Sequence, residues 1–182
     1  MKRNAAEPAS VRHEIPPVWN SESRILLLGT MPSPKSREAG FFYMHPQNSF
    51  WRVLPAVFGE ALVYPNKSSE REAAIAERRS FLLRHGIALW DVLSSCDISG
   101  AADASIRNAV PNDFHEIFEH AQIHRVFCTG KSAFTLWQKH CAAEYEGRYK
   151  LTCECLPSTS PANASWMEVR LLKEYMRITG AS

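Results

Sequence analysis

Three polar segments of the sequence carry side chains that can position water or donate to a leaving group. They are residues 29–33, residues 45–48 and residues 157–163. Within the second segment, the Asn48 amide can accept a hydrogen bond from water through its oxygen and donate one through its nitrogen. Asn48 is therefore the first candidate for a catalytic residue. It also lies directly before a segment with helical spacing, so a helix N-cap is the structural alternative.

Two glycine-containing turns can bring backbone N–H groups against a ligand. Residues 29–33 close a short apolar run, where a tight turn between a strand and a loop explains the same residues. Residues 129–132 end another apolar run and open a helix, whose first N–H groups can bind an anion or a carbonyl. The spacing of the second turn is too short for a Walker P-loop.

The elements that must position these segments alternate along the chain. A short apolar run typical of a strand buried on both faces occupies residues 24–29, and further strands are expected at residues 87–92, 124–129 and 149–156. Helical spacing covers residues 49–58, 69–85, 111–121, 133–141 and 166–178. This alternation predicts an α/β fold, a three-layer α/β/α domain with a mostly parallel central sheet of about four strands. Residues 32–40 and 96–110 are expected to be irregular.

The carboxyl ends of parallel strands meet at one edge of a sheet, and ligands bind outside that edge. The prediction therefore gathers residues 29–33, 91–94, 129–132 and 157–160 into one pocket. Asp91 stands at one of these strand ends. Its carboxylate could orient groups near the pocket or bond to the backbone of the turn that follows.

Composition favours a globular protein outside the membrane. The 182-residue chain is 45% hydrophobic, which suits one domain with a full core. No apolar run approaches the ~20 residues that span a bilayer, and the polar N-terminus lacks a signal-peptide core. Residues 1–20 are expected to form a flexible arm and residues 21–182 a single domain. The net charge of +2 neither indicates nor excludes a groove that binds nucleic acid.

The five cysteines lack the paired spacing of zinc or iron–sulfur sites. Cys153 and Cys155 alternate within a strand-like run, and the others stand alone. An odd number of cysteines in a reducing compartment argues against disulfide bonds. We expect thiols in or near the core and no metal.

Taken in order, three segments resemble the uracil-DNA glycosylase superfamily, and most closely its DNA-deoxyinosine (hypoxanthine-DNA) glycosylase branch. The resemblance is carried by Gly29-Thr30-Met31-Pro32-Ser33, by Phe41-Phe42-Tyr43-Met44-His45-Pro46-Gln47-Asn48-Ser49-Phe50-Trp51 and by Leu156-Pro157-Ser158-Thr159-Ser160-Pro161-Ala162-Asn163. Mismatch-specific uracil-DNA glycosylases share the His-Pro-x-Asn-x-Phe-Trp part. The likeness runs from about residue 15 to the end, and it implies a uracil-DNA glycosylase-like α/β/α domain.

Such an enzyme flips a deaminated base out of DNA and hydrolyses its N-glycosidic bond. The departing base gains negative charge, so the site needs a positioned water and donors aimed at the base. The resemblance implies that Asn48 fills this role. The superfamily's first motif commonly has Asp or Asn just before its proline, where this chain has Met31. That difference moves the catalytic burden to Asn48 and disfavours the usual uracil-enzyme mechanism.

The resemblance also implies a base pocket and a DNA-contacting surface. Tyr43 aligns with an aromatic residue that stacks on the extruded base, an interaction worth about 1–3 kcal/mol per base. Thr129 stands where related enzymes often carry an Asn that reads the base edge. The expected pocket residues are Gly29, Thr30, Met31, Pro32, Tyr43, Thr129 and Gly130. The expected DNA-binding residues are Ser33, Lys131, Ser158, Thr159, Ser160 and Asn163.

Several of these residues also have structural alternatives. Residues 157–163 read as an ordinary turn on composition alone, and Asn163 could cap the last helix. Lys131 could be solvated, and His45 is expected to be structural. Positive charges that flank the first motif could contact phosphate or simply lie on the surface; they are Lys35, Arg37 and Arg52.

The sequence therefore predicts a monomeric, monofunctional DNA glycosylase for a deaminated base, with hypoxanthine as the preferred base. No lysine is placed like an amine nucleophile in the motifs, so a strand-cleaving lyase step is not expected. No cofactor follows from any motif, and the expected location is cytoplasmic, at the nucleoid. Two alternatives stay open. The enzyme could remove uracil from mismatches, against which Met31 argues, or the chain could be a catalytically silent relative that binds damaged DNA.

Overall fold

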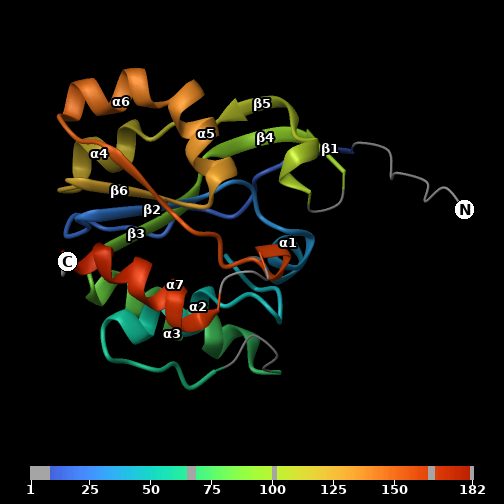
Figure 1. Ribbon diagram of the computed structural model, residues 1–182, viewed down its shortest axis with the longest axis vertical. Coiled ribbons are helices and arrows are strands. Elements are labelled where there is room, and N and C mark those ends of the chain that lie inside the picture. The colour runs from blue at the N-terminus through green and yellow to red at the C-terminus, as the bar shows by residue number, and fades with distance from the viewer. Residues whose placement is uncertain (1–8, 65–68, 100–101, 164–166, 181–182) are drawn as a thin grey trace, which may run out of the picture.

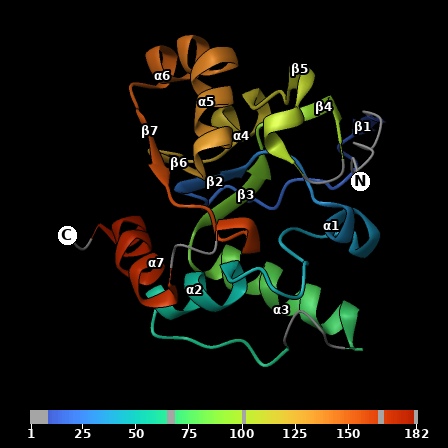
Figure 2. The ribbon, with the colours of Figure 1, turned by 45° about the vertical axis from the view of Figure 1, so that its right-hand side comes forward.

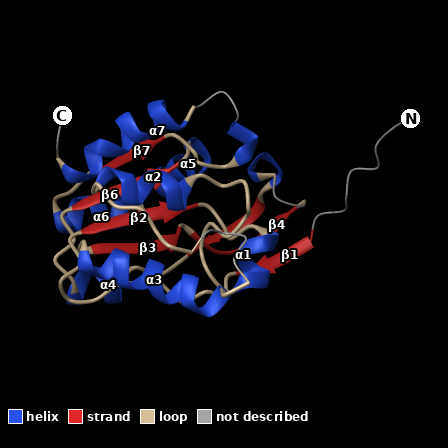
Figure 3. Cartoon of the chain, turned by 90° about the horizontal axis from the view of Figure 1, so that it is seen from below, coloured by secondary structure: helices blue, strands red, loops and turns tan. Residues whose placement is uncertain are grey.

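A four-stranded parallel sheet forms the centre of the protein in a computed structural model that describes residues 9–64, 69–99, 102–163 and 167–180. Its strands are β2 (Ile25–Gly29), β3 (Ile87–Asp91), β6 (Arg125–Thr129) and β7 (Cys153–Leu156). They pair in the order β3-β2-β6-β7, and Figure 3 shows them side by side. The predicted parallel sheet is confirmed.

The apolar runs become strands because each of their faces is covered by helices. Successive side chains of a strand point to opposite faces, so Leu27 and Phe127 join one core cluster while Leu26 and Leu28 join the other. The three leucines are fully buried. A segment without polar side chains on either face is stable only between two layers.

Helices form the two outer layers (Figures 1 and 2). One layer holds α2 (Phe50–Val57), α3 (Arg71–Arg84) and α7 (Glu168–Tyr175). The other holds α4 (His115–His120), α5 (Lys131–His140) and α6 (Ala142–Tyr149). The predicted three-layer α/β/α arrangement is confirmed. None of the helices that the structure describes is long and apolar enough to cross a membrane.

Two of the predicted boundaries are wrong for local reasons. Residues 34–39, expected to be loop, form α1 (Pro34–Ala39). The Ser33 hydroxyl accepts a hydrogen bond from the Ser36 N–H at 3.2 Å, and Gly40 ends the helix in a left-handed conformation with φ 71°, so both termini are capped. The fourth strand begins only at Cys153, because the chain before it forms α6.

A second, antiparallel sheet was not predicted. It consists of β1 (Ala9–Arg12), β4 (Leu93–Ile98) and β5 (Arg107–Pro111) in the order β1-β4-β5. Short 3-10 helices lie at Asp103–Ser105, Pro161–Asn163 and Met176–Thr179. The segment 96–110, expected to be an irregular connection, thus supplies the second half of β4 and all of β5 except Pro111. Its strands are half exposed and interrupted by register shifts, so no clean alternation marks them in the sequence.

Within the segment expected to be a flexible arm through residue 20, the described residues pair with both sheets. Residues 9–12 pair with β4, and Val18 pairs with Leu89 at the edge of the central sheet. Ile15 and Val18 are buried. These contacts are with partners about 70 residues or more away in the chain, so local composition does not reveal them. Residues 1–8 lie outside the described part.

All five cysteines are thiols, and four of them are buried. Cys128 and Cys153 lie on neighbouring strands with their sulfur atoms 3.4 Å apart. Within the described ranges, no group of His, Cys, Asp and Glu could hold a metal ion.

The Asn112 side chain fastens the end of β3 to the start of β4. Its amide nitrogen donates to the backbone oxygens of Asp91 at 2.9 Å and Leu93 at 3.0 Å. The side chain is buried, so it donates to both carbonyl groups away from water.

We expect Asn112→Ala to lower the free energy of unfolding by about 1–3 kcal/mol, because it leaves buried carbonyls without a donor. Asn112→Asp is expected to cost more, since it places oxygen against oxygen. Urea denaturation measures both changes. Gln122→Ala, which shortens an exposed amide, serves as the control. Equal stability of Asn112→Ala and the control would contradict this role.

Candidate active site

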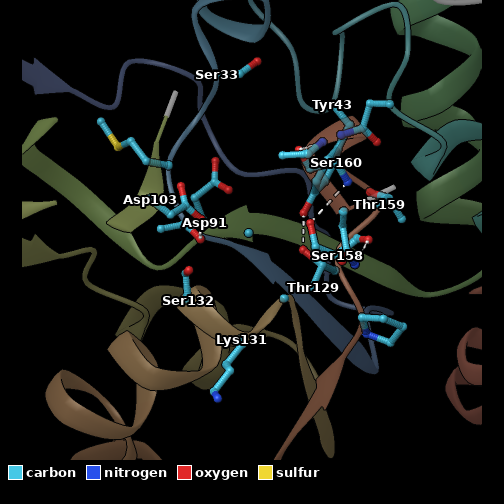
Figure 4. Close-up of a pocket in the computed structure, with 18 of the residues that line it drawn as sticks. Ser33, Tyr43, Asp91, Asp103, Thr129, Lys131, Ser132, Ser158, Thr159 and Ser160 are labelled. Atoms are coloured by element: carbon cyan, nitrogen blue, oxygen red, sulfur yellow. Dashed lines mark hydrogen bonds between the residues drawn. The ribbon is translucent and has the colours of Figure 1, made fainter. Parts of the chain in front are cut away.

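A pocket of about 780 Å³ opens at the carboxyl ends of the parallel strands. Its walls come from the turn after β2, the end of β3, the turn after β6 and the loop after β7. Figure 4 shows Asp91 and Asp103 on one side of it and Tyr43 with residues 158–160 on the other. The structure therefore brings together the four strand ends that the sequence analysis placed in one site.

All the predicted base-pocket residues line this pocket: Gly29, Thr30, Met31, Pro32, Tyr43, Thr129 and Gly130. So do Asn48 and the expected DNA-binding residues Ser33, Lys131, Ser158, Thr159, Ser160 and Asn163. Their proximity follows from the strand order, because β2 lies between β3 and β6, and β7 follows β6.

The side chains of Asp91 and Tyr43 pack closely against the backbone of Gly29. A Cβ atom built on it would lie 2.1 Å from Asp91 Oδ1 and 2.9 Å from Tyr43 Oη. Both distances are below van der Waals contact, so no larger residue fits here without displacing the Asp91 and Tyr43 side chains. The glycine that reads as a simple turn in the sequence is thus required by a carboxylate and a phenol that pack against its backbone.

Tyr43 is held rigidly beside that glycine. Its ring stacks on Phe50 with centroids 3.9 Å apart and planes at 14°, and its hydroxyl lies 2.6 Å from Thr129 Oγ1. Because Thr129 gives its own O–H to the Leu28 carbonyl at 3.2 Å, the tyrosine is the donor in the shorter bond. Burial, and next the charge of Asp91, raise the pKa of Tyr43 well above its usual value. The residue is a neutral, fixed aromatic wall.

Asn48 combines the two roles that its sequence context allows. Its Oδ1 accepts a hydrogen bond from the Phe50 N–H at 2.9 Å, which caps the first turn of α2. Its amide nitrogen has no hydrogen-bond partner among the residues that the structure describes. The side chain lines the pocket. The cap therefore fixes the oxygen end and leaves the N–H₂ end able to donate to a ligand.

The loop after β7 is braced against the Asn48 turn. The backbone oxygen of Thr159 accepts a hydrogen bond from the Ser49 N–H at 3.1 Å, and Asn163 donates to the Ser158 carbonyl at 3.0 Å. Asn163 thus closes its own loop, and it does not cap α7, which begins at residue 168. Thr159 is only 3% exposed, so a phosphate contact suits the partly exposed Ser158 and Ser160 better.

The turn after β6 approaches this loop closely. Gly130 has φ 132°, a backbone conformation that strains any residue with a side chain. A Cβ atom on it would also lie 3.2 Å from the Ser158 Cβ and crowd it. Lys131 and Ser132 follow as the first residues of α5. Lys131 is exposed, with its charge near the positive end of the helix dipole.

Three residues with carboxyl groups line the pocket, Asp91, Asp103 and Glu174, and only Asp91 was predicted there. Glu174 pairs with Arg177 at 3.4 Å. Asp103 comes from the irregular segment after β4, and its Oδ2 accepts a hydrogen bond from Thr30 Oγ1 at 2.9 Å. Much of the residue is exposed, but its carboxyl group is partly buried. This burial raises the pKa of Asp103, hydrogen bonds from Thr30 and Ser132 lower it by less, and the charge of Asp91 raises it further. Nothing in the sequence around Asp103 marks it, because a loop crossing places it there.

The positively charged residues that flank the first motif bind partners within the protein. Lys35 pairs with Glu38 at 2.8 Å, and Arg52 donates to Glu168. Arg37 donates to the Pro32 carbonyl at 2.9 Å, which braces the first motif. His45 Nδ1 accepts from the Gln47 N–H at 3.2 Å, in keeping with the expected structural role. A phosphate would have to compete with these bonds.

Comparisons with known proteins agree with this geometry. The family model of the uracil DNA glycosylase superfamily matches residues 16–178. A hypoxanthine DNA glycosylase of Methanosarcina acetivorans is 28% identical over 164 residues, covering 88% of this chain and 93% of the relative. One of Methanosarcina barkeri is 35% identical over 99 residues, covering 54% of this chain and 58% of the relative.

The fold is shared with a solved structure as well. A solution NMR structure of a Methanosarcina acetivorans protein assigned as a uracil DNA glycosylase superposes with a TM-score of 0.69 at 24% identity. The match covers 92% of this chain and 98% of that one. At this identity, the similarity shows that the α/β/α fold is shared and shows no more than the fold.

The fold and the pocket define a three-layer α/β/α protein that can take a ligand at the carboxyl ends of its parallel strands. The chain belongs to the uracil DNA glycosylase superfamily. Together with the relatives named above, this membership indicates a DNA glycosylase enzyme. The family predicted from the three motifs is confirmed.

We expect Gly29→Ala to fold but to lower the single-turnover rate of base excision by about 100-fold, because displacement of a site by about 1 Å costs that much. Gly147→Ala is the matched control, since a Cβ atom there meets nothing within 4 Å. The control should retain its rate and gain up to ~1 kcal/mol of helix stability. An unchanged rate in Gly29→Ala would refute the importance of this close approach.

Proposed function

We propose that this protein removes hypoxanthine from DNA by hydrolysing the bond between the base and its sugar, with Asn48 as the catalytic residue. The observation that carries the proposal is the position of Asn48 at the wall of the pocket, with an amide nitrogen that has no hydrogen-bond partner among the described residues. The names of the two Methanosarcina relatives support hypoxanthine as the base. Met31, which has no polar group, supports a mechanism that does not rely on the first motif to activate water.

In the proposed reaction, water attacks C1′ of the sugar while the bond from C1′ to the base breaks. The bonding electrons leave with the base, which takes up a proton, and the water oxygen remains on the abasic sugar. Asn48 donates through its nitrogen to the base as negative charge develops there. Removal of a single donor of this type costs about 10²–10³ in rate. Tyr43 supplies the flat surface against which the extruded base stacks.

The DNA-binding part of the proposal rests on the rim of the pocket. Ser33, Ser158 and Ser160 present hydroxyl groups, Asn163 stiffens its loop, and Lys131 adds the charge. Groups of this kind contact phosphate without reading sequence. We further propose that a monomer acts on DNA that contains a deaminated base, in the cytoplasm at the nucleoid.

We expect Asn48→Ala to lower excision of hypoxanthine by at least about 100-fold, and to cost about 1 kcal/mol of stability through loss of the cap. Asn48→Asp keeps the capping oxygen but removes the donor. It should therefore fold like the wild type and lose as much activity as the alanine variant. Labelled duplexes that carry hypoxanthine, uracil or xanthine, treated with alkali after incubation, report the abasic product.

The outcomes of this experiment separate the alternatives. Retained activity in Asn48→Asp would show that Asn48 acts on water through its oxygen. Full activity in Asn48→Ala would refute the mechanism. A wild-type preference for uracil would overturn the choice of base, and binding without any abasic product would overturn the enzymatic proposal.

Lys131→Ala should weaken binding to all duplexes alike and lower the slope of log K against log salt by about 1. Each phosphate contact that a lysine makes releases counterions, which is the physical cause of the slope. Fluorescence anisotropy at several salt concentrations measures it. Lys139→Ala, at the far end of the same helix and also exposed, is the matched control, and equal slopes for the two variants would exclude the contact.

A further inference from the structure

Asp91 occupies an unusual position for a structural carboxylate. It ends β3, where its register partner on β2 is Gly29, and it lines the pocket although it is only 4% exposed. Its Oδ2 lies 2.8 Å from His13 Nε2. Its Oδ1 lies over the Gly29 backbone, on the same side as the Tyr43 hydroxyl. One oxygen is thus held by the protein, and the other faces the space where a base would stack on Tyr43.

His13 holds the carboxylate from the N-terminal segment. The side chain is 1% exposed and packs against Phe42 and Trp90, with ring centroids 6.0 Å and 6.1 Å away. Its Nδ1 has no hydrogen-bond partner in the described part of the chain. The backbone N–H of His13 donates to the Ser94 carbonyl at 2.8 Å. The described bonds of this ring therefore go to Asp91 alone, and they fix which oxygen faces the pocket.

An ionised aspartate accepts hydrogen bonds and cannot donate them. Deamination changes the base in the complementary way. Adenine and cytosine carry a ring nitrogen with a lone pair next to an amino group. Hypoxanthine and uracil carry an N–H at that ring position next to a carbonyl. A carboxylate placed against this edge attracts the N–H of the deaminated base and repels the lone pair of the parent base.

We infer that Asp91 is the residue that distinguishes a deaminated base from its parent base, by accepting the ring N–H through Oδ1, and that His13 is the positioning residue that orients it. The inference rests on the proposed function, and names how the same pocket selects its substrate. Asp103 faces the same pocket but is bonded to Thr30 at the loop crossing, so Asp91 is the acceptor beside the Tyr43 surface. The Thr129 hydroxyl is already donated to Leu28.

The test compares two substrates that differ at the inferred contact. Duplexes carry either hypoxanthine or 1-methylhypoxanthine, in which a methyl group replaces the ring N–H, and single-turnover excision rates are measured for both. A hydrogen bond to a charged group is worth about 10- to 150-fold, so the wild type should prefer hypoxanthine by at least about 10-fold. Asp91→Ala removes the acceptor and makes room, so this preference should decrease by about 10-fold or more.

The ratio of the two rates separates this role from a structural one. A variant that merely packs poorly loses both rates together and keeps the ratio. His13→Ala should move the ratio in the same direction as Asp91→Ala. His13→Gln should restore it, because the glutamine amide can donate from a position near that of Nε2. Asp113→Ala, which removes an exposed carboxylate outside the pocket, should leave the ratio at the wild-type value.

Binding to a duplex with an abasic site gives a second control, because this product has no base to meet Asp91. All four variants should bind it as the wild type does. An unchanged ratio in Asp91→Ala would overturn the inference about Asp91, and an unchanged ratio in His13→Ala would overturn the role of His13. If uracil is the base removed, uracil and 3-methyluracil replace the pair. A wild type without product on any base would instead refute the proposed function.

Discussion

The close approach of Asp91 to the Gly29 backbone is the constraint on which the site depends. The two residues are register partners on β3 and β2, and the absence of a side chain at Gly29 lets the carboxylate lie over the neighbouring strand. The Tyr43 hydroxyl enters the same space. Once these groups are in contact, the turn after β2 can follow only a narrow path, and that path forms one wall of the pocket.

The surrounding framework makes this contact rigid. The sheet is buried on both faces, so the strand ends cannot shift without opening the core. Polar side chains then connect the strand ends to one another: Asn112 joins β3 to β4, and Thr129 joins β6 to β2 through the Leu28 carbonyl. A site built on such elements holds its groups in place before a substrate arrives, which lowers the cost of ordering them in the transition state.

The charge distribution suits an enzyme that takes in a base and leaves the phosphates outside. Asp91 and Asp103 face the pocket, while the charged and hydroxyl groups of Lys131, Ser158 and Ser160 lie at its rim. Carboxylates repel the DNA backbone, so the pocket favours entry of the uncharged base. Tyr43 stays protonated in this pocket, because burial, and next the negative charge of Asp91, raise the pKa of its hydroxyl.

The sequence by itself determined the central sheet, the family and the residues of the three motifs, because long apolar runs and short motifs are local properties of a chain. It could not place β1, nor show that the segment before residue 20 delivers His13 to Asp91, since that contact joins residues 78 apart. Nor could it find Asp103, which reaches the pocket through a loop crossing. For Asn48, the turn that reads as a helix cap proved to cap with the amide oxygen. Only the tertiary structure decided that the residue lines a pocket and that, in the described part of the chain, its nitrogen has no partner, because the opposite wall comes from strands elsewhere in the sequence.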